Sequence, residues 1–515
     1  MSHIYKIIDS KAWLHSIEDN TFIETNMLKL FNDDILNSEY NIIKSPTRES
    51  NSLVGTFSTS QTQRYGKNKR GNTIFMVKPI DYRLPGFLIS YGGKLKGKIA
   101  IKFKFTNWDS KLPSGTIIDI ICSLDNSPDD EIEKILMYHY DIYPKKQKKQ
   151  IEYNDRDIIR KELDLYIFSI DPDNCEDIDD AMSISINNDI TTIGIHIAQP
   201  IVYLSEDDIL NKSEKNFSTL YLENERKDLW GSEITMLSSL SQNNKKPAYS
   251  IFYSFDKNNN IVDIVNYPSM IINSAVLTYN NALNNSKAKE LFAFTNNLTC
   301  IKDYHDMVSY WMVKTNTTVG NILKDRGNIP YRINSEKEFD NKEWNLPPDV
   351  ITAFKSKSIN SAEYSFENSI HSSLGVENYC HFTSPIRRIV DTWVHYKLTF
   401  DNCKSLDLDI VNYYDSVSKK FHRDLMLKKK LDGYFKDSDT INGYGYIYKI
   451  ISNNVLELYI PELELFKKVP IYNMKFDYII IKNIDGDILV LTYDDINYTF
   501  KVGDRLKISL NKKLT

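Results

Sequence analysis

The chain has 515 residues, of which 41% are hydrophobic and 26% charged, and its formal net charge is −5. This length exceeds one ordinary hydrophobic core, so about two to four domains are expected, and the composition excludes a largely disordered chain. The sequence contains no run of about 18 apolar residues, no signal-peptide core and no Cys-x-x-Cys pair, which excludes a membrane span and predicts an intracellular, cytoplasmic protein without a zinc site.

The first 145 residues divide into a weakly patterned and a strand-rich part. Residues 1–50 show some helical periodicity and a loop near Lys44–Arg48. Short strands split by Gly and Pro then predict a small OB-type barrel within residues 51–145. The expected strands are Leu53–Phe57, Thr73–Val77, Gly86–Ser90, Lys98–Phe105 and Thr116–Cys122. An acidic helix, Asp129–Tyr140, and a basic linker, Lys145–Gln150, are expected to follow.

The predicted barrel concentrates basic charge. Residues 61–104 hold eleven Lys and Arg against one acid, Asp81, with aromatic residues interleaved. Basic charge with aromatics suits the binding of single-stranded nucleic acid, through phosphate neutralisation and base stacking. A solvated charged face remains the alternative.

A dense acidic run in the middle of the chain leads into an apolar, strand-like segment, Ala181–Ile186. Like charges about 4 Å apart repel by roughly 4 kcal/mol at an effective dielectric near 20, so a folded protein needs a counter-charge here. Mg²⁺ takes carboxylate oxygens, and paired metal ions drive in-line displacement at phosphorus. A calcium-binding EF-hand loop is excluded, because it would need Gly and Glu where the chain has Glu176 and Met182. The acids are Asp171, Asp173, Glu176, Asp177, Asp179 and Asp180.

The region after the acidic run predicts a mixed α/β domain. Strand patterns at Met182–Ile186 and Thr191–Ala198 flank a turn triplet, which indicates a hairpin. Helical patterns follow at Asp303–Lys324, Pro385–Phe400 and Leu406–Phe435.

The segment His381–Tyr396 contains a second candidate functional motif. Thr383 or Ser384 is expected to N-cap a helix that begins at Pro385. Two arginines, Arg387 and Arg388, would then lie in its first turn, where they oppose the helix dipole unless they bind an anion. Phosphate would suit their forked donors, and ion pairs with Asp391 are the alternative.

The last part of the chain changes to a two-residue period. Such alternation in short strands fits a second OB-type barrel. The expected strands are Gly443–Ile450, Val455–Ile460, Tyr478–Ile481, Ile488–Tyr493 and Arg505–Leu510.

These motifs together resemble the ribonuclease II/ribonuclease R superfamily, the RNB domain. The spacing Asp-x₅-Asp-x-Asp-Asp-Ala from Asp171, the segment Gly194–Ala198 and the segment His381–Arg388 match its signatures. Val77–Pro85 is similar to the second cold-shock barrel of the eukaryotic branch that includes the exosome catalytic subunit, without that subunit's N-terminal nuclease domain. The resemblance covers about residues 50–515.

The resemblance implies an α+β multidomain fold, in which a central mixed α/β RNB catalytic domain is flanked by small OB-type barrels. The implied parts are an N-terminal extension or rudimentary cold-shock barrel in residues 1–50, a cold-shock-like OB barrel in 51–145, the RNB catalytic domain in 151–435 and an OB-fold RNA-binding domain in 441–515.

The resemblance also implies a reaction, processive 3′→5′ hydrolysis of single-stranded RNA to nucleoside 5′-monophosphates by a two-metal Mg²⁺ mechanism. Asp179, Asp180 and Arg387 would be catalytic, with Arg387 clamping the phosphate. A monomer is expected, and nothing implies an exosome-like partner or a membrane. The implied metal ligands are Asp171, Asp177, Asp179 and Asp180, and the implied RNA-binding residues are Tyr221, Tyr279, Ser384 and Arg388.

Several alternatives remain open. Each tyrosine could belong to ordinary core packing. Gln199 stands where the family usually has Asp, which is expected to affect support of the RNA end. The second hypothesis for function is a catalytically inactive RNA-binding protein on the same fold, and the third is a DNA-directed exonuclease or a scaffold in a decay complex.

Overall fold

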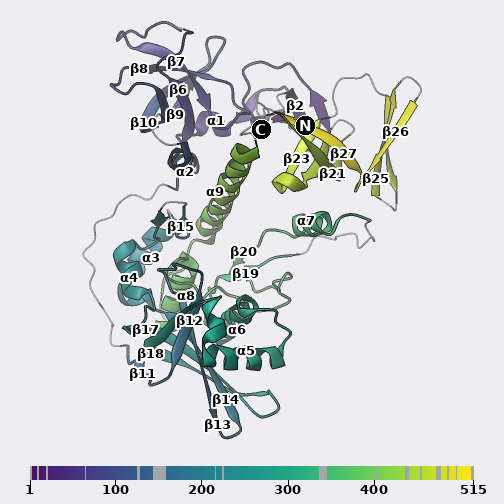
Figure 1. Ribbon diagram of the computed structural model, residues 1–515. Helices are drawn as coiled ribbons and strands as arrows, with labels where there is room; N and C mark the ends of the chain where they lie inside the picture. The colour runs from purple at the N-terminus through teal and green to yellow at the C-terminus, as the bar shows by residue number, and fades with distance from the viewer. Residues whose placement is uncertain are drawn as a thin grey trace. The chain divides into compact units, whose positions relative to one another are not determined.

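The chain forms two compact units in a computed structural model (Figure 1). One unit comprises Met1–Tyr143, Glu338–Ser358 and Lys419–Thr515, and the other comprises Pro144–Lys337 and Ile359–Ser418. The predicted linker Lys145–Gln150 lies outside the described residues. The structure describes residues 3–8, 11–18, 21–63, 65–124, 128–142, 158–214, 216–222, 225–335, 345–400, 403–434, 440–452, 455–470, 477–483, 486–493 and 496–511.

The N-terminal residues form a sheet, so the helical periodicity expected for residues 1–50 was wrong. Buried and partly buried positions share the first strand, and the buried Trp13 packs with Val455 of the C-terminal sheet in the same unit. This tertiary partner favours strands where the local sequence pattern is weak. The strand order is β3-β2-β1-β4-β5. The elements are β1 (His3–Ile8), β2 (Lys11–Ser16), β3 (Phe22–Glu24), β4 (Ile35–Leu36), β5 (Ile42–Lys44) and the short helix α1 (Pro46–Glu49).

A closed five-stranded barrel follows, as the sequence predicted, in the order β10-β8-β7-β6-β9. Its interior is aromatic and includes the buried rings of Phe57, Phe87 and Phe103. The acidic helix was also correctly predicted, and its Ile135 packs against Val54 and Ala100 of the barrel. The elements are β6 (Leu53–Ser58), β7 (Thr73–Pro79), β8 (Phe87–Tyr91), β9 (Lys98–Asn107), β10 (Ser114–Ser123) and α2 (Pro128–His139).

The C-terminal strands form two sheets, in the orders β23-β22-β21-β27 and β24-β25-β26. Leu489 of the second sheet joins Ile447 and Leu458 of the first in one core. Helix α7 (Pro348–Ser358), from the middle of the chain, buries Val350 and Phe354 against the first sheet. Two strands, β23 and β26, were not predicted. The elements are β21 (Thr440–Ser452), β22 (Val455–Ile460), η4 (Pro461–Leu463), β23 (Leu465–Pro470), β24 (Asp477–Asn483), β25 (Gly486–Tyr493), β26 (Ile496–Lys501) and β27 (Arg505–Asn511).

The second unit is built on a six-stranded mixed sheet, in the order β11-β18-β12-β13-β14-β17. The predicted hairpin is present as β13 and β14, with Asp180 opposite Ile197 at one end and Asn187 opposite Ile190 at the other. The strands are β11 (Lys161–Glu162), β12 (Ile167–Asp171), β13 (Asp180–Asn187), β14 (Ile190–Ala198), β17 (Lys245–Phe255) and β18 (Ile261–Thr278).

Helices and short strand pairs complete this unit, and one continuous core includes Ile195, Trp311 and Trp393. The helices are η1 (Pro200–Val202), α3 (Glu206–Ser213), α4 (Ser232–Ser238), η2 (Asn281–Asn284), α5 (Ser286–Leu298), α6 (Tyr304–Leu323), η3 (Lys324–Arg326), α8 (Ile389–Thr399) and α9 (Leu408–Tyr434), of which α9 continues into the first unit. The short strands are β15 (Leu220–Tyr221), β16 (Arg226–Lys227), β19 (Tyr331–Ile333) and β20 (Glu363–Ser365).

The predicted fold class is confirmed, since the structure is α+β with a mixed central domain and OB-like β-domains. The domain boundaries 1–50, 51–145, 151–435 and 441–515 stay predictions. None of the helices in the described part of the chain is long and apolar enough to cross a membrane.

Candidate active site

The sheet topology gathers three of the predicted site residues at one edge. Strand β12 ends at Asp171, the adjacent antiparallel strand β13 begins at Asp180, and the acidic run is the connection between them. Asp171 also lies opposite Thr278, the last residue of β18, so Tyr279 emerges at the same edge. Neighbouring strands thus place residues that are more than 100 apart in sequence beside one another.

The carboxyl groups at this edge are hard to ionise without a counter-charge. Burial raises the pKa of Asp171 to about 6, and the nearby Asp177 contributes to the rise. Burial and the charges of Asp171 and Asp179 raise the pKa of Asp180 well above its usual value. The pKa of Tyr279 is raised by burial and by Asp180 and Asp171. The half-buried Tyr279 also packs against the core of this unit.

Asp177 is buried and held by three side chains. The Tyr221 hydroxyl donates a hydrogen bond to Oδ2, Arg226 Nη1 donates to Oδ1 over 3.2 Å, and the Cys175 thiol donates to Oδ1 over 3.7 Å. The Tyr221 side chain is 45% exposed, so the structure does not support core packing for this residue. Asp173 is exposed and Glu176 points largely into solvent, which fits a peripheral place for both.

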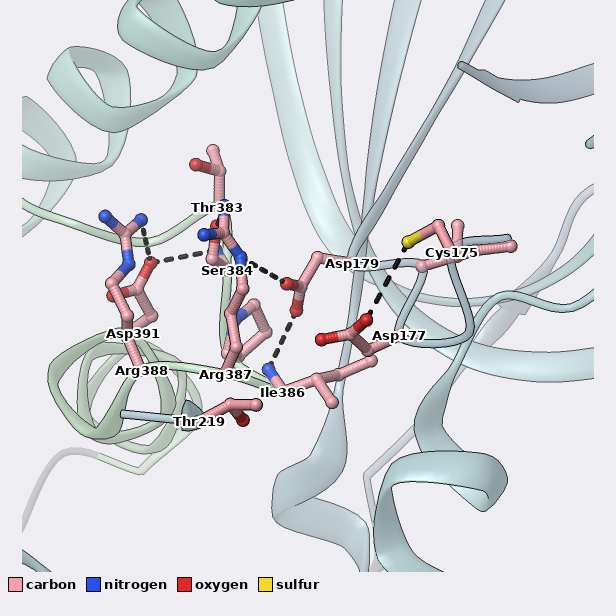
Figure 2. Close-up of polar contacts among 12 residues, drawn as sticks. Cys175, Asp177, Asp179, Thr219, Thr383, Ser384, Ile386, Arg387, Arg388 and Asp391 are labelled. Carbon is pink, nitrogen blue, oxygen red and sulfur yellow. Dashed lines mark hydrogen bonds and ion pairs between the residues drawn. The ribbon is translucent and has the colours of Figure 1, made fainter. Parts of the chain in front are cut away.

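Asp179 connects the acidic run to the arginine segment. Its Oδ1 accepts a hydrogen bond of 2.8 Å from the Ile386 backbone N–H, and its Oδ2 pairs with Arg387 Nε at 3.2 Å (Figure 2). Burial raises the pKa of Asp179 to about 7, although Arg387 and the Ile386 N–H oppose the rise. Ser384 is buried, and its hydroxyl accepts a hydrogen bond of 2.9 Å from Arg387 Nη2. Ser384 therefore orients the guanidinium.

The expected helix start at Pro385 was wrong, because helix α8 begins at Ile389 with Arg388 as its N-cap residue. Residues 385–387 form a turn, and the backbone around Arg388 pairs with a neighbouring segment instead. Thr219 N–H donates to Arg387 C=O at 2.9 Å, and Ile389 N–H donates to Phe217 C=O at 3.0 Å. These bonds hold Arg388 in an extended conformation, at φ −130° and ψ 131°, so the helix begins only at Ile389. The two arginines therefore do not share a helical first turn.

Arg387 and Arg388 contact different carboxylates, Asp179 and Asp391 respectively (Figure 2). Arg388 Nη2 pairs with the fully buried Asp391 at 2.8 Å, which is the ion pair that the sequence left open. Asp391 also accepts a 2.8 Å hydrogen bond from the Ser384 backbone N–H. Arg388 Nη1 lies 3.5 Å from His381 Nε2. The geometry therefore favours a structural role for Arg388 over the predicted contact with RNA.

Replacing Arg388 by alanine is expected to lower the free energy of unfolding by about 3–5 kcal/mol, because Asp391 would stay buried without its cation. Urea unfolding, with hydrogen exchange of the α8 amides, measures the loss. Arg423→Ala is the matched control, since the Arg423 side chain is 67% exposed and should change stability by less than about 0.5 kcal/mol. Equal stability of the two variants would contradict the structural role.

Gln199, which stands where the family usually has Asp, makes side-chain hydrogen bonds that suit an amide. Its side chain is fully buried, accepts a 2.6 Å hydrogen bond from Arg160 Nη1 and donates to Thr399 Oγ1 over 3.3 Å. An amide satisfies a donor and an acceptor at once, which a carboxylate cannot do.

Arg226 is a site residue that the sequence reasoning missed. It lies in β16 and reaches Asp177, although they are 49 residues apart in sequence. The available signal was a lone arginine in the acidic stretch Tyr221–Asp228, close to a tyrosine already considered part of the site.

The donor set fits a hard divalent cation. All four carboxylates offer oxygen ligands, and Asp171 Oδ2 is buried without a hydrogen-bond partner. The carboxylate oxygens of these four residues are not clustered, because Asp177 and Asp179 form ion pairs with arginines instead. In the described part of the chain, the candidate ligand atoms within 4.8 Å of one another belong instead to Asp303, His305 and Asp306. That exposed group is explained by capping of helix α6, in which Asp303 accepts a hydrogen bond from the Asp306 backbone.

The middle of the chain matches a known domain family, and the chain has curated relatives. Residues 160–292 and 293–400 match the RNB domain family. Ribonuclease R of Aquifex aeolicus is 23% identical over 399 residues, which cover 59% of this chain and 56% of that protein. The chain thus spans about half the length of the curated relatives it matches.

Solved structures share the fold. RNase R of Mycoplasma genitalium, in complex with ribose methylated single-stranded RNA, aligns with a TM-score of 0.74 at 18% identity, over 100% of this chain and 99% of that chain. Yeast Ssd1, a pseudonuclease, aligns with a TM-score of 0.60 at 13% identity, over 96% and 81%. The matched residues show that the chain contains an RNB domain, and the relatives and the common fold support membership of the ribonuclease II/ribonuclease R superfamily.

Proposed function

We propose that this protein is a 3′→5′ exoribonuclease that hydrolyses single-stranded RNA processively to nucleoside 5′-monophosphates, with Mg²⁺ in a two-metal mechanism. The observation that carries the proposal is the pairing of Asp179 with Arg387. It brings the acidic edge of the sheet together with a guanidinium whose side chain is still 46% exposed. Carboxylates that hold metal ions and an accessible arginine that binds phosphate can together promote phosphodiester hydrolysis.

Each predicted residue has a role in this proposal. Bound Mg²⁺ would neutralise the acidic edge and supply a water nucleophile near neutral pH. Asp171, Asp177, Asp179 and Asp180 would hold it. Arg387, oriented by Ser384, would bind the scissile phosphate and stabilise the charge that develops on it.

Two tyrosines and the barrel would grip the RNA. The exposed Tyr221 donates to Asp177, and the half-buried Tyr279 follows Thr278, which lies opposite Asp171. Both would offer rings on which terminal bases can stack, at about 1–3 kcal/mol per base. Most basic residues of the barrel are exposed, which suits phosphate contacts. These exposed residues are Lys67, Lys69, Arg70, Lys78, Arg83, Lys94, Lys96, Lys98 and Lys104.

A catalytically inactive RNA-binding protein is the second candidate function. The observation that favours it is the fold shared with Ssd1, a pseudonuclease. An inactive member is expected to have lost a ligand carboxylate or the phosphate-binding arginine. All four aspartates and Arg387 are retained here, and Asp179 and Arg387 are in contact. This retention favours the enzyme.

One cleavage assay separates the candidates. The protein is incubated with uniformly labelled oligo-RNA and Mg²⁺, and in parallel with EDTA and with DNA of the same sequence. The enzyme predicts Mg²⁺-dependent release of nucleoside monophosphates from RNA, without accumulation of intermediate lengths. Tight RNA binding without any product would support the inactive protein, and equal cleavage of DNA would support the third hypothesis.

A further inference from the structure

A short hairpin presents two side chains to one carboxylate of the acidic run. Tyr221 in β15 and Arg226 in β16 are directly opposite each other in the antiparallel register. Both donate to Asp177, Tyr221 to Oδ2 and Arg226 to Oδ1. The two oxygens of this carboxylate are therefore each fixed by one residue of the same hairpin.

Arg226 is itself anchored. Its Nε pairs with Asp228 at 2.5 Å, and its Nη2 pairs with Glu176 at 3.0 Å. The Asp228 side chain is only 7% exposed, whereas that of Glu176 is 78% exposed, so Asp228 is the firm support. Burial opposes the charge of Arg226, but the hydrogen bond that it donates to Asp228 raises its pKa. The guanidinium thus stays charged and bridges Asp228 to Asp177.

We infer that Arg226, anchored by Asp228, is a positioning residue that sets the orientation of the Asp177 carboxylate for a divalent cation. This inference rests on the proposed function, because it assumes that Asp177 is a metal ligand. Groups that orient metal-binding carboxylates typically change metal affinity by about 10–100-fold when they are removed.

A purely electrostatic role predicts a different pattern. If Arg226 acted only through its charge, Arg226→Ala would remove a repelling cation and strengthen metal binding. Asp228→Asn would remove an attracting anion and weaken it. Positioning predicts the same sign for both substitutions, because each one releases Asp177 from its support. It also predicts that the double variant is no worse than the single variants, since both break one chain of contacts.

The test is a titration of the RNA-free protein with Mn²⁺, in which electron paramagnetic resonance reports the free aquo ion. Mn²⁺ serves as the probe because, like Mg²⁺, it prefers carboxylate oxygens. We expect Arg226→Ala and Asp228→Asn each to weaken Mn²⁺ binding about tenfold or more, without additivity. Lys227→Ala is the matched control, since Lys227 is the next residue of β16 and pairs with Glu225 instead. It should bind Mn²⁺ like the wild type.

The outcomes separate this inference from the proposed function, because metal binding is read without cleavage. Wild-type affinity in both variants, or effects of opposite sign, would overturn the positioning role even if the protein cleaves RNA. Weakened binding in both variants would support it even if no cleavage is found. Absence of Mn²⁺ binding to the wild type would also overturn it. If Arg226→Ala does not fold, Arg226→Lys replaces it, because one ammonium cannot bridge the carboxylates as the fork does.

Discussion

Replacing Asp179 by asparagine is expected to abolish RNA cleavage, with a fall in kcat of roughly a thousandfold or more, and to leave RNA affinity nearly unchanged. Asp179 is buried and joins both halves of the site, through the Ile386 N–H and the Arg387 guanidinium. Asparagine keeps the size of the side chain but removes the charge that a metal and Arg387 require. RNA contacts made by tyrosines and by the barrel would remain. Single-turnover cleavage at saturating Mg²⁺ and RNA binding in EDTA, where the wild type does not degrade the RNA, report the two properties separately.

Asp173→Asn is the control for this prediction. Asp173 lies in the same acidic run and loses the same charge, but its side chain is exposed. Its variant should cleave at close to the wild-type rate. If both variants lose activity equally, the general charge of the run matters rather than the position of Asp179. If Asp179→Asn cleaves normally, the assignment of this residue to the metal site is wrong.

The strands around the acidic run were predictable because their hydrophobic periodicity is strong. Met182–Ile186 and Thr191–Ala198 flank a turn triplet, and the structure extends each strand by only a few residues, as β13 and β14. This hairpin places Asp180 at the start of its first strand. The sequence therefore determined much of the acidic edge through local pattern alone.

The start of helix α8 was not predictable from the same kind of pattern. Ser384 and Pro385 have the chemistry of a helix N-terminus, yet residues 385–387 form a turn, Arg388 is extended, and the helix begins only at Ile389. The cause is a set of backbone hydrogen bonds to Phe217 and Thr219, which are remote in sequence. A rule that considers only neighbouring residues cannot predict hydrogen bonds to segments that are remote in sequence.

Non-local pairing also explains the other differences. Arg226 reaches Asp177 only because the β15–β16 hairpin folds onto the acidic run. Trp13 is buried by Val455 from the far end of the chain, so the strands near the N-terminus depend on a contact that no short window contains.

Replacing Arg387 by alanine is expected to lower kcat by about 10²–10³-fold, which is the typical loss when one donor to a developing oxyanion is removed. Arg387→Lys should recover part of this loss, because an ammonium supplies charge but not a planar fork. Stability should fall less than in Arg388→Ala, since Arg387 is 46% exposed. Single-turnover cleavage of oligo-RNA measures the rate, and a wild-type rate in Arg387→Ala would refute the phosphate-binding role.

The same substitution has a second effect that a double variant can isolate. Arg387→Ala removes one of the two groups that hold Asp179, so part of the lost rate could arise from a displaced carboxylate. If Arg387 acted only by holding Asp179, the double variant Asp179→Asn with Arg387→Ala should cleave no more slowly than Asp179→Asn alone, whereas a separate role of Arg387 at the phosphate predicts a further loss of rate. A Mn²⁺ titration of Arg387→Ala then tests the carboxylate. Unchanged metal affinity with lost activity would locate the role of Arg387 at the phosphate, because a displaced Asp179 would weaken both.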